Sequence, residues 1–192
     1  DVVVACVGLD ATLEGEEGDT GNEFSSGDKP DLRLPESQRI LLRKLEALGK
    51  PLVIVLAAGS SVNVEVKCDA LLDMWYPGQL GGRALANLLF GDVSPSGKLP
   101  DTIAYEISDY PSDKFFGSGD MDCYGEDIYV GYRYFETFAK DRVRFPFGFG
   151  MSYTSFDITA SDFKLDGNKV TGSVNVKNTG STPGREVVQI YC

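Results

Sequence analysis

The chain has 192 residues, of which 42% are hydrophobic, and its formal net charge is −11. This length is enough for one domain, or for one domain and part of another, and the hydrophobic content supports a sizeable core. The acidic charge and the lack of a Lys/Arg cluster exclude nucleic acid as a partner, because an acidic surface repels phosphate backbones. No stretch of about 18 apolar residues is present, so we expect no membrane partner either.

The sequence contains no histidine. This excludes Ser-His-Asp and Cys-His nucleophile systems, and also zinc sites built on imidazole. The segment Gly59–Ser61 also lacks the G-x-S-x-G pattern of a serine hydrolase. Acid–base chemistry near neutral pH must therefore use carboxylate, Cys, Lys or Tyr side chains.

Four cysteines are present, and none belongs to a C-x-x-C pair: Cys6, Cys68, Cys123 and Cys192. Cys6 lies inside an apolar run and Cys68 lies beside another, so we interpret them as free thiols in the core. A disulfide between Cys6 and Cys68 is the alternative if the protein is exported.

The chain opens with a strand and a long polar segment. Residues 1–9 (DVVVACVGL) form a continuous valine-rich run, which is typical of a strand buried on both faces of a parallel sheet. Residues 10–33 are acidic, rich in glycine and without periodicity, so they predict a long loop. Long loops in compact domains are usually functional or disordered.

A helix is predicted next, between Pro35 and Gly49. Proline is favoured in the first turn of a helix, and glycine is favoured just after the last. Leu41, Leu45 and Leu48 recur at the spacing of one helical face, so we expect that face to be buried.

Strands and helices alternate over the next fifty residues. Residues 51–58 (PLVIVLAA) and 70–75 (ALLDMW) predict buried strands, and residues 82–90 predict a short helix that ends at Gly91. This order indicates the α/β class, with a mostly parallel sheet flanked by helices. We expect residues 1–150 to form this domain. Because active-site groups follow the carboxyl ends of such strands, the loop at 10–33 is a candidate site.

The last third of the chain changes in character. Residues 91–153 are rich in Gly, Pro and aromatic residues, which favours irregular wrapping segments. From Ser152 the pattern has a period of two, with a hairpin turn expected at Asp166–Gly167 and another strand at Val187–Cys192. About four of the roughly seven strands of an immunoglobulin-like sandwich are visible. We therefore expect a partial all-β immunoglobulin-like segment over residues 151–192.

Six segments carry a family pattern in the family's order along essentially the whole chain. They are VGLDATLEGEE with DLRLPESQ, KPLVIVLAAG, WYPGQLGGRALANLLFGDVSPSGKLP, IYVGYRYFE, FPFGFGMSYTSF and VKNTGSTPGREVVQIY. The chain thereby resembles the C-terminal region of glycoside hydrolase family 3, the β-glucosidases and β-xylosidases. The WYPGQ to PSGKLP string is the longest and most specific part of the resemblance.

The resemblance implies a position within a larger enzyme. Family members typically have a (β/α)8 barrel, then an α/β sandwich domain, and often a fibronectin type III domain. We expect this chain to be the later part of the sandwich domain and the start of the fibronectin-like domain. The barrel of the same protein is then its missing partner, and an extracellular or periplasmic location is expected.

The resemblance also implies a reaction. Family enzymes hydrolyse terminal β-linked glucose or xylose from an oligosaccharide or β-glycoside, with retention of configuration and without a metal or organic cofactor. An aspartate of the barrel attacks the anomeric carbon, and a glutamate, often from the sandwich domain, donates the proton. The chain would thus hold the proton donor and lack the nucleophile, so that it would be inactive in isolation.

Three glutamates within four residues are the catalytic candidates: Glu14, Glu16 and Glu17. Retaining glycosidases need two carboxyl groups about 5–5.5 Å apart, one of them protonated, and repulsion between neighbouring carboxylates helps one to keep its proton. The family's Glu-x-Glu pattern, counted from Gly8–Asp10, puts Glu16 at the donor position. Glu17, which precedes Gly18–Asp19, is the second candidate, and Glu14 is the third.

Other interpretations remain open for these features. The glutamates could form a solvated acidic loop or a calcium site, although their spacing does not fit an EF-hand loop. The chain could also be a non-catalytic carbohydrate-binding or scaffold module. Trp75, Tyr76 and Gln79 could contact a sugar or simply pack, and Asp28–Lys29 stands where family members often carry an Asp-Arg pair.

Overall fold

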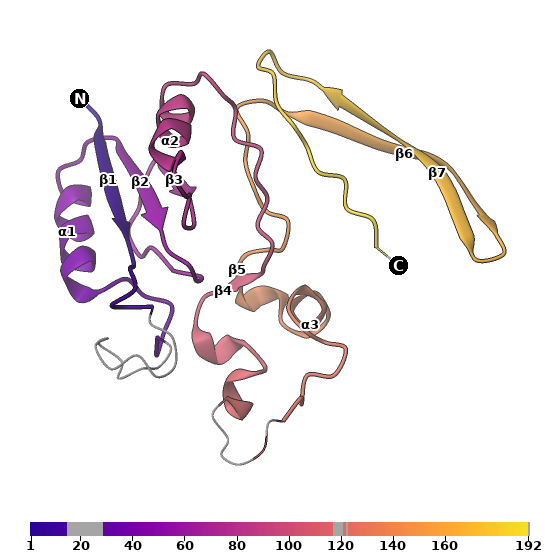
Figure 1. Ribbon diagram of the computed structural model, residues 1–192, viewed down its shortest axis with the longest axis horizontal. Coiled ribbons are helices and arrows are strands. Elements are labelled where there is room, and N and C mark those ends of the chain that lie inside the picture. Colours follow the sequence, from indigo (N-terminus) through magenta and orange to yellow (C-terminus); the bar gives the residue numbers. More distant parts are fainter. Residues whose placement is uncertain (15–28, 117–120, 122, 192) are drawn as a thin grey trace. The chain divides into compact units, whose positions relative to one another are not determined.

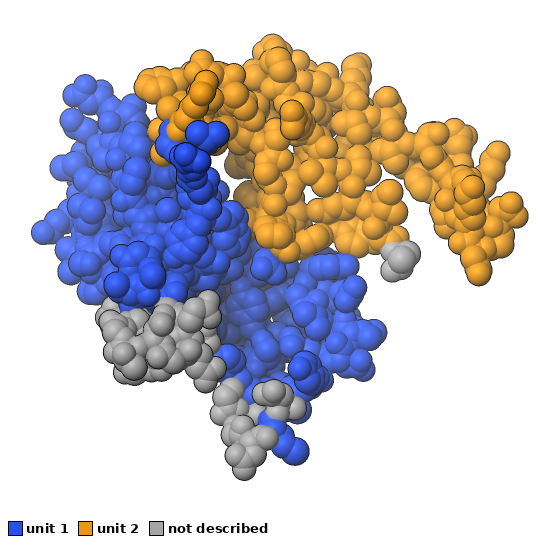
Figure 2. Space-filling view, viewed as in Figure 1, with its two compact units in different colours: residues 1–82, 101–146 blue, residues 83–100, 147–192 orange. Residues whose placement is uncertain are grey.

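A computed structural model describes residues 1–14, 29–116, 121 and 123–191. The chain divides into two compact units (Figure 2). The first unit comprises residues 1–82 and 101–146, and the second comprises residues 83–100 and 147–192. Each unit is described below by itself.

A three-stranded parallel sheet forms the centre of the first unit (Figure 1). Its strands are β1 (Val3–Gly8), β2 (Leu52–Ala57) and β3 (Ala70–Asp73), in the order β1-β2-β3. Both pairings are parallel. The predicted α/β class and the presence of the three strands are therefore confirmed. The predicted burial is wrong for β1, which is buried on one face only, and for β3, which has no buried residue.

Along the outermost strand, β1, buried and exposed side chains alternate. Ala5 and Val7 are buried in the core, whereas Val4 and Cys6 are exposed on the other face. Cys6 is a free thiol, as are Cys68 and Cys123. The prediction of a core thiol is wrong for Cys6, because successive side chains of a strand point to opposite faces and only one face of β1 is covered.

Helix α1 (Glu36–Glu46) joins β1 to β2, between Pro35 and Gly49 as predicted. Its predicted buried face is partly wrong. Leu42 is 1% exposed and Leu45 packs against the core, whereas Leu41 is 46% and Leu48 is 58% exposed. The core side is centred on Leu42, which lies about 100° around the helix from Leu41. Leucines on adjacent faces made the sequence pattern ambiguous.

The carboxyl end of β1 depends on a glycine. A Cβ atom at Gly8 would lie 1.8 Å from the carbonyl oxygen of Ala57 on β2. On the other side, the amide of Gln38 from α1 accepts a hydrogen bond from the Gly8 N–H at 2.9 Å and donates one to the Gly8 carbonyl at 2.7 Å. The backbone of β1 is thus fixed against both β2 and α1 at this point.

Helix α2 (Gly81–Leu89) follows β3 and confirms the predicted short helix. Gly91 follows it in a left-handed conformation, with φ of +79°. Glycine adopts this conformation without steric cost, which is why it ends helices so often.

The region between α2 and the hairpin is more regular than predicted. Strand β4 (Ile103–Ala104) pairs antiparallel with β5 (Val143–Phe145), and helix α3 (Tyr132–Phe138) lies between them in sequence. The prediction of irregular segments is wrong for α3. Its Phe135 is 1% exposed and meets the ring of Tyr110 edge-on at 5.4 Å, so tertiary packing stabilises a helix of low intrinsic propensity. Among the described residues of this region there are also three short 3₁₀ helices: η1 (Ile107–Asp109), η2 (Asp113–Phe115) and η3 (Lys140–Arg142).

The second unit contains the predicted β-hairpin. Strands β6 (Phe156–Asp166) and β7 (Lys169–Asn178) pair antiparallel. The turn lies at Gly167 and Asn168, one residue later than predicted, and Gly167 has a φ of +58°. The strand predicted at Val187–Cys192 is wrong over Val187–Tyr191, which is in no strand and pairs with none of the described strands. The domain boundary at residue 150 and the immunoglobulin-like assignment stay predictions.

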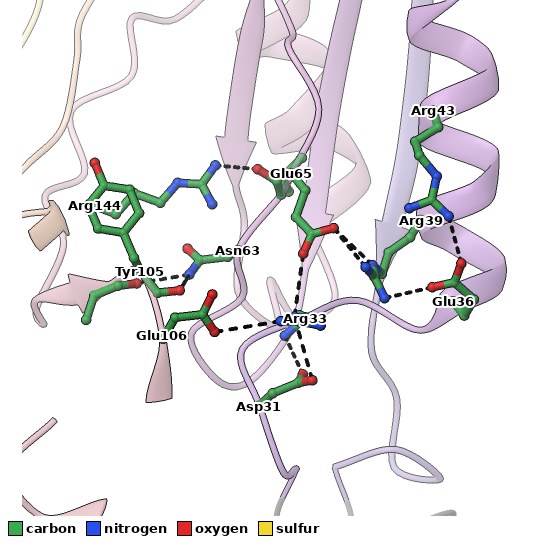
Figure 3. A network of polar contacts seen from close by, with 12 residues as sticks. Asp31, Arg33, Glu36, Arg39, Arg43, Asn63, Glu65, Tyr105, Glu106 and Arg144 are labelled. Atoms are coloured by element: carbon green, nitrogen blue, oxygen red, sulfur yellow. Dashed lines mark hydrogen bonds and ion pairs between the residues drawn. The ribbon is translucent and has the colours of Figure 1, made fainter. Parts of the chain in front are cut away.

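A polar network ties the β4 segment to the sheet within the first unit (Figure 3). Asn63, which is 6% exposed, donates to the carbonyls of Ala104 at 2.9 Å and Tyr105 at 2.7 Å. Arg144 donates to the carbonyl of Val64. Buried amides and carbonyls that lose such partners are costly, so these bonds fix residues 63–64 against β4 and β5.

Ion pairs surround that buried connection. Arg33 approaches Glu65 at 3.6 Å and Glu106 at 3.9 Å, and Arg39 bridges Glu36 at 2.7 Å and Glu65 at 3.0 Å (Figure 3). Most of these side chains are substantially exposed, and exposed pairs contribute little each. The Asn63 hydrogen bonds therefore carry more of this connection than the ion pairs do.

The corrected face of α1 can be tested by truncating two neighbouring leucines. We expect Leu42→Ala to lower the free energy of unfolding by about 2–5 kcal/mol, because it leaves a cavity in the core. Leu41→Ala is the matched control and should cost about 1 kcal/mol or less, since its side chain is largely exposed. Chemical denaturation of both variants gives the comparison, and equal losses would contradict the assigned face.

Candidate functional site

Three loops meet at one edge of the parallel sheet. The carboxyl ends of parallel strands lie at the same edge, and the arrows of β1 and β2 in Figure 1 point the same way. The chain continues from β1 into Leu9, from β2 into Gly59 and Ser60, and from β3 into Tyr76. The Tyr76 hydroxyl lies 3.4 Å from the Leu9 carbonyl oxygen, so the first and third of these loops are neighbours.

The carboxylate of Glu14 is the point on which these loops converge. It accepts hydrogen bonds from the Gly59 N–H at 2.7 Å, from the Ser60 hydroxyl and from the Tyr76 hydroxyl. Gly59 has to lack a side chain here, since a Cβ atom would lie 2.6 Å from the Tyr76 ring. The partners lie 45 to 62 residues away from Glu14 in sequence, so the tertiary fold creates this cluster.

These contacts decide the protonation state of Glu14. Burial raises the pKa of Glu14. The hydrogen bonds from Ser60, Tyr76 and Gly59 and the charge of Lys29 together lower it by more than burial raises it, so the pKa of Glu14 is below its usual value. Burial, the hydrogen bond to Glu14 and the charge of Glu14 together raise the pKa of Tyr76 to about 12. At neutral pH the pair is therefore a carboxylate that accepts from a neutral phenol.

Lys29, which follows the acidic segment in sequence, contacts the loop after β2 that also binds Glu14. Its ammonium donates to the carbonyl of Ser61 at 3.2 Å. Burial lowers the pKa of Lys29, and the charges of Glu14 and Asp31 oppose that shift. Lys29 and Glu14 are therefore both placed against the turn at residues 59–61.

The backbone is unusual just before Tyr76. Trp75 has a φ of +51°, a left-handed conformation that costs a residue with a side chain about 1–3 kcal/mol. The Trp75 N–H donates to Asp73 at 3.2 Å. Burial raises the pKa of Asp73, and this hydrogen bond opposes the rise. The sharp bend after β3 directs the chain to Tyr76, whose hydroxyl reaches Glu14.

The candidates from the sequence have different outcomes. Glu16 and Glu17 lie outside the described residues, and Glu14 belongs to the cluster. Of the three residues considered for sugar contact, Tyr76 joins the cluster, Trp75 is partly buried and Gln79 is exposed. The assignment of a catalytic role among the glutamates stays a prediction.

Two partners of the cluster, Gly59 and Ser60, and one neighbouring acid, Asp73, are not indicated as site residues by the sequence. The sequence around Gly59 and Ser60 bears only on a serine hydrolase motif, which it lacks. Asp73 closes the β3 strand, and its position at a strand end was the available signal. Nothing in the local sequence indicated that Ser60 would meet Glu14, because their contact depends on the pairing of β1 with β2.

Over the part of the chain that the structure describes, no group of three or more His, Cys, Asp and Glu side chains could hold a metal ion. In the same part, no helix has the length and apolar character needed to cross a membrane.

Comparison with known proteins gives the family. Residues 1–153 match the family described as "Glycosyl hydrolase family 3 C-terminal domain". The chain belongs to this family. The matched range includes the parallel sheet, α1, α2 and the Glu14 cluster, so the candidate site lies within the range that matches the family.

Two relatives and one solved structure show how close this family 3 chain is to known enzymes. It is 51% identical over 162 residues to a beta-glucosidase of Ruminococcus albus, covering 82% of this chain and 17% of that protein. It is 37% identical over 198 aligned positions to a xylan 1,4-beta-xylosidase of Xylanibacter ruminicola, covering 98% of this chain and 21% of that protein. The structure of a beta-glucosidase from Paenibacillus barengoltzii matches with a TM-score of 0.80 and 39% identity, covering 94% of this chain and 20% of that one.

The family 3 chain thus spans about a fifth of the length of these relatives. Its fold is the fold of the corresponding part of a solved beta-glucosidase. The predicted membership of glycoside hydrolase family 3 is confirmed.

The ionised state of Glu14 predicts a pH-dependent stability effect. Because its folded pKa is lowered, its stabilising contribution is present at neutral pH and is lost as the pH falls below about 4. We expect Glu14→Gln to lower the free energy of unfolding by about 1 kcal/mol at pH 7, since the site is partly exposed, and by less at low pH.

Denaturant unfolding between pH 3 and about 7 measures this difference. Glu136→Gln is the matched control, because Glu136 makes an exposed ion pair with Lys140 at 2.9 Å, worth about 0.3–0.5 kcal/mol. A Glu14 effect that grows as the pH falls would contradict the assigned ionisation.

Proposed function

We propose that the chain is part of a retaining β-glycosidase that hydrolyses terminal β-linked glucosides or xylosides, and that it supplies the general acid/base but not the nucleophile. The observation that carries the proposal is the sequence identity to a beta-glucosidase and to a xylan 1,4-beta-xylosidase over most of the chain. Both relatives are about five times longer, which leaves room for a further domain that holds the nucleophile.

Glu16 is the proposed proton donor, with Glu17 as the second and Glu14 as the third candidate. In the first step the donor protonates the leaving oxygen while an aspartate of the (β/α)8 barrel attacks the anomeric carbon. In the second step the same residue, now a carboxylate, takes a proton from the water that hydrolyses the glycosyl-aspartate. The clustering of three strand-end loops at Glu14 supports this edge as the place where the acidic segment begins.

We also propose a substrate class, a partner domain and a cellular location for the protein. The substrate is an oligosaccharide or β-glycoside, and the barrel of the same protein provides the remainder of the sugar-binding pocket. An extracellular or periplasmic location is proposed with it. The described cysteines are free thiols, so the proposal does not depend on a disulfide among them.

Leaving-group dependence in the full-length enzyme tests the donor. We expect Glu16→Gln to reduce kcat/KM for alkyl glycosides by about 10²–10⁴-fold, the usual size of a general-acid contribution. Aryl glycosides with good leaving groups need little protonation and should lose far less in the glycosylation step. Steady-state kinetics over a series of aglycones measures both.

Glu136→Gln, which removes an exposed ion pair with Lys140, is the matched control and should leave the dependence on leaving group close to that of the wild type. Glu17→Gln tests the second candidate in the same assay. Equal loss on alkyl and activated aryl glycosides in Glu16→Gln would overturn the donor assignment. Tight glucose or xylose binding by the isolated chain in calorimetry would instead favour a non-catalytic carbohydrate-binding module.

A further inference from the structure

We propose that Glu14 is a positioning residue: together with Lys29 it fixes the two ends of the acidic segment on the turn at residues 59–61, and it does not itself donate a proton. This inference rests on the proposed function, since it concerns the same half of the catalytic site. It gives Glu14 a task of its own, whereas the sequence pattern ranks Glu14 only as the third candidate donor.

The hydrogen bonds of Glu14 leave little room for a donor role. Its Oε1 accepts from the Ser60 hydroxyl, and its Oε2 accepts from both the Gly59 N–H and the Tyr76 hydroxyl. An ionised carboxylate only accepts hydrogen bonds, so three donors match this form. Protonation would put a fourth hydrogen among them, whereas a general acid has to carry its proton and present it to the substrate.

The backbone conformation lets Gly59 and Tyr76 both reach the Glu14 carboxylate. A Cβ atom at position 59 would lie 2.6 Å from the Tyr76 ring and 3.2 Å from Glu14 Oε2, so the absence of a side chain lets the three groups meet. Trp75, in its left-handed conformation, immediately precedes Tyr76, whose hydroxyl is the third donor to Glu14. Unfavourable backbone conformations persist where the surrounding structure holds them, and they occur often at functional sites.

Lys29 gives the second attachment. Its ammonium donates to the Ser61 carbonyl at 3.2 Å, next to the residue whose hydroxyl binds Glu14. The charge of Glu14 also acts on this half-buried ammonium. Positions 14 and 29 are therefore both held at residues 59–61.

The consequence is mechanistic. A donor two residues after Glu14 has to be held within a fraction of an ångström of the leaving oxygen, because small misplacements of reacting groups cost up to about 10²-fold in rate. Glu14 is held at the carboxyl end of the parallel sheet by Ser60 and Tyr76, which follow the ends of the paired strands β2 and β3. Glu14 is the link between those strands and the acidic segment.

The test uses Glu14→Gln, Tyr76→Phe and Lys29→Met in the full-length enzyme, with Glu136→Gln as the control. We expect the first three to lower kcat for alkyl glycosides by about 10–100-fold with KM changed by less than about threefold. The alkaline limb of the pH–rate profile, which reports the donor's own ionisation, should persist. Azide should not restore activity, because the donor carboxyl group is still present. Hydrogen exchange over residues 15–28 should rise in the same variants and not in Glu136→Gln.

Two results would overturn the inference. Loss of the alkaline limb together with azide rescue in Glu14→Gln would identify Glu14 as the donor. Unchanged kcat and unchanged hydrogen exchange in all three variants would show that the attachment positions nothing. If Glu14→Gln does not fold, Tyr76→Phe removes a single hydroxyl and still decides the question.

The companion variant Glu16→Gln separates this inference from the proposed function. If Glu16→Gln shows a donor's leaving-group dependence while the Glu14, Tyr76 and Lys29 variants behave as wild type, only the positioning role fails. If neither Glu16→Gln nor Glu17→Gln shows that dependence, the proposed function of the acidic segment fails irrespective of Glu14.

Discussion

The parallel pairing of β1 with β2 is the constraint on which the candidate site depends. It requires glycine at position 8, where a side chain would collide with the carbonyl of Ala57, and it brings the ends of both strands to one edge. Leu9 continues from that edge and donates its N–H to Ala57 at 2.9 Å, which extends the pairing one residue further. Only four residues then separate Leu9 from Glu14, so Glu14 cannot lie far from the sheet.

Neighbouring glutamates of one segment can differ in ionisation state, because their surroundings differ. Glu14 is surrounded by an N–H group, two hydroxyls and a nearby ammonium, all of which favour its charged form. A fixed negative charge at this place also disfavours ionisation of any carboxyl group nearby, since like charges raise each other's pKa. An anchored, ionised Glu14 is therefore compatible with a protonated glutamate close by, which is what a retaining glycosidase requires.

The first unit owes its integrity to buried connections between segments distant in sequence. Asn63 binds the carbonyls of β4 and its following residue, and Phe135 of α3 packs against Tyr110. The ion pairs around Arg33 and Arg39 are more numerous but more exposed, so water and salt weaken them. The turn at residues 59–61 lies between β2 and Asn63, and it is thereby held from both sides.

The sequence by itself determined the strands of the parallel sheet, helices α1 and α2, the β6–β7 hairpin and the family, because periodicity, glycine and proline signals and long specific motifs are local properties. It did not determine which face of α1 is buried, since Leu41, Leu42, Leu45 and Leu48 cover adjacent faces and only docking on the sheet selects Leu42. It also missed α3, whose aromatic residues become helical through packing of Phe135.

The same division holds for the site. Three acidic residues in a loop after a buried strand were visible in the sequence, but the partners of Glu14 are 45 to 62 residues away and come from two other strand ends. Strand pairing brought Gly59, Ser60 and Tyr76 to that carboxylate. The tertiary structure therefore decided that Glu14 is a charged acceptor, because the pKa of a carboxyl group follows the donors and charges around it in space.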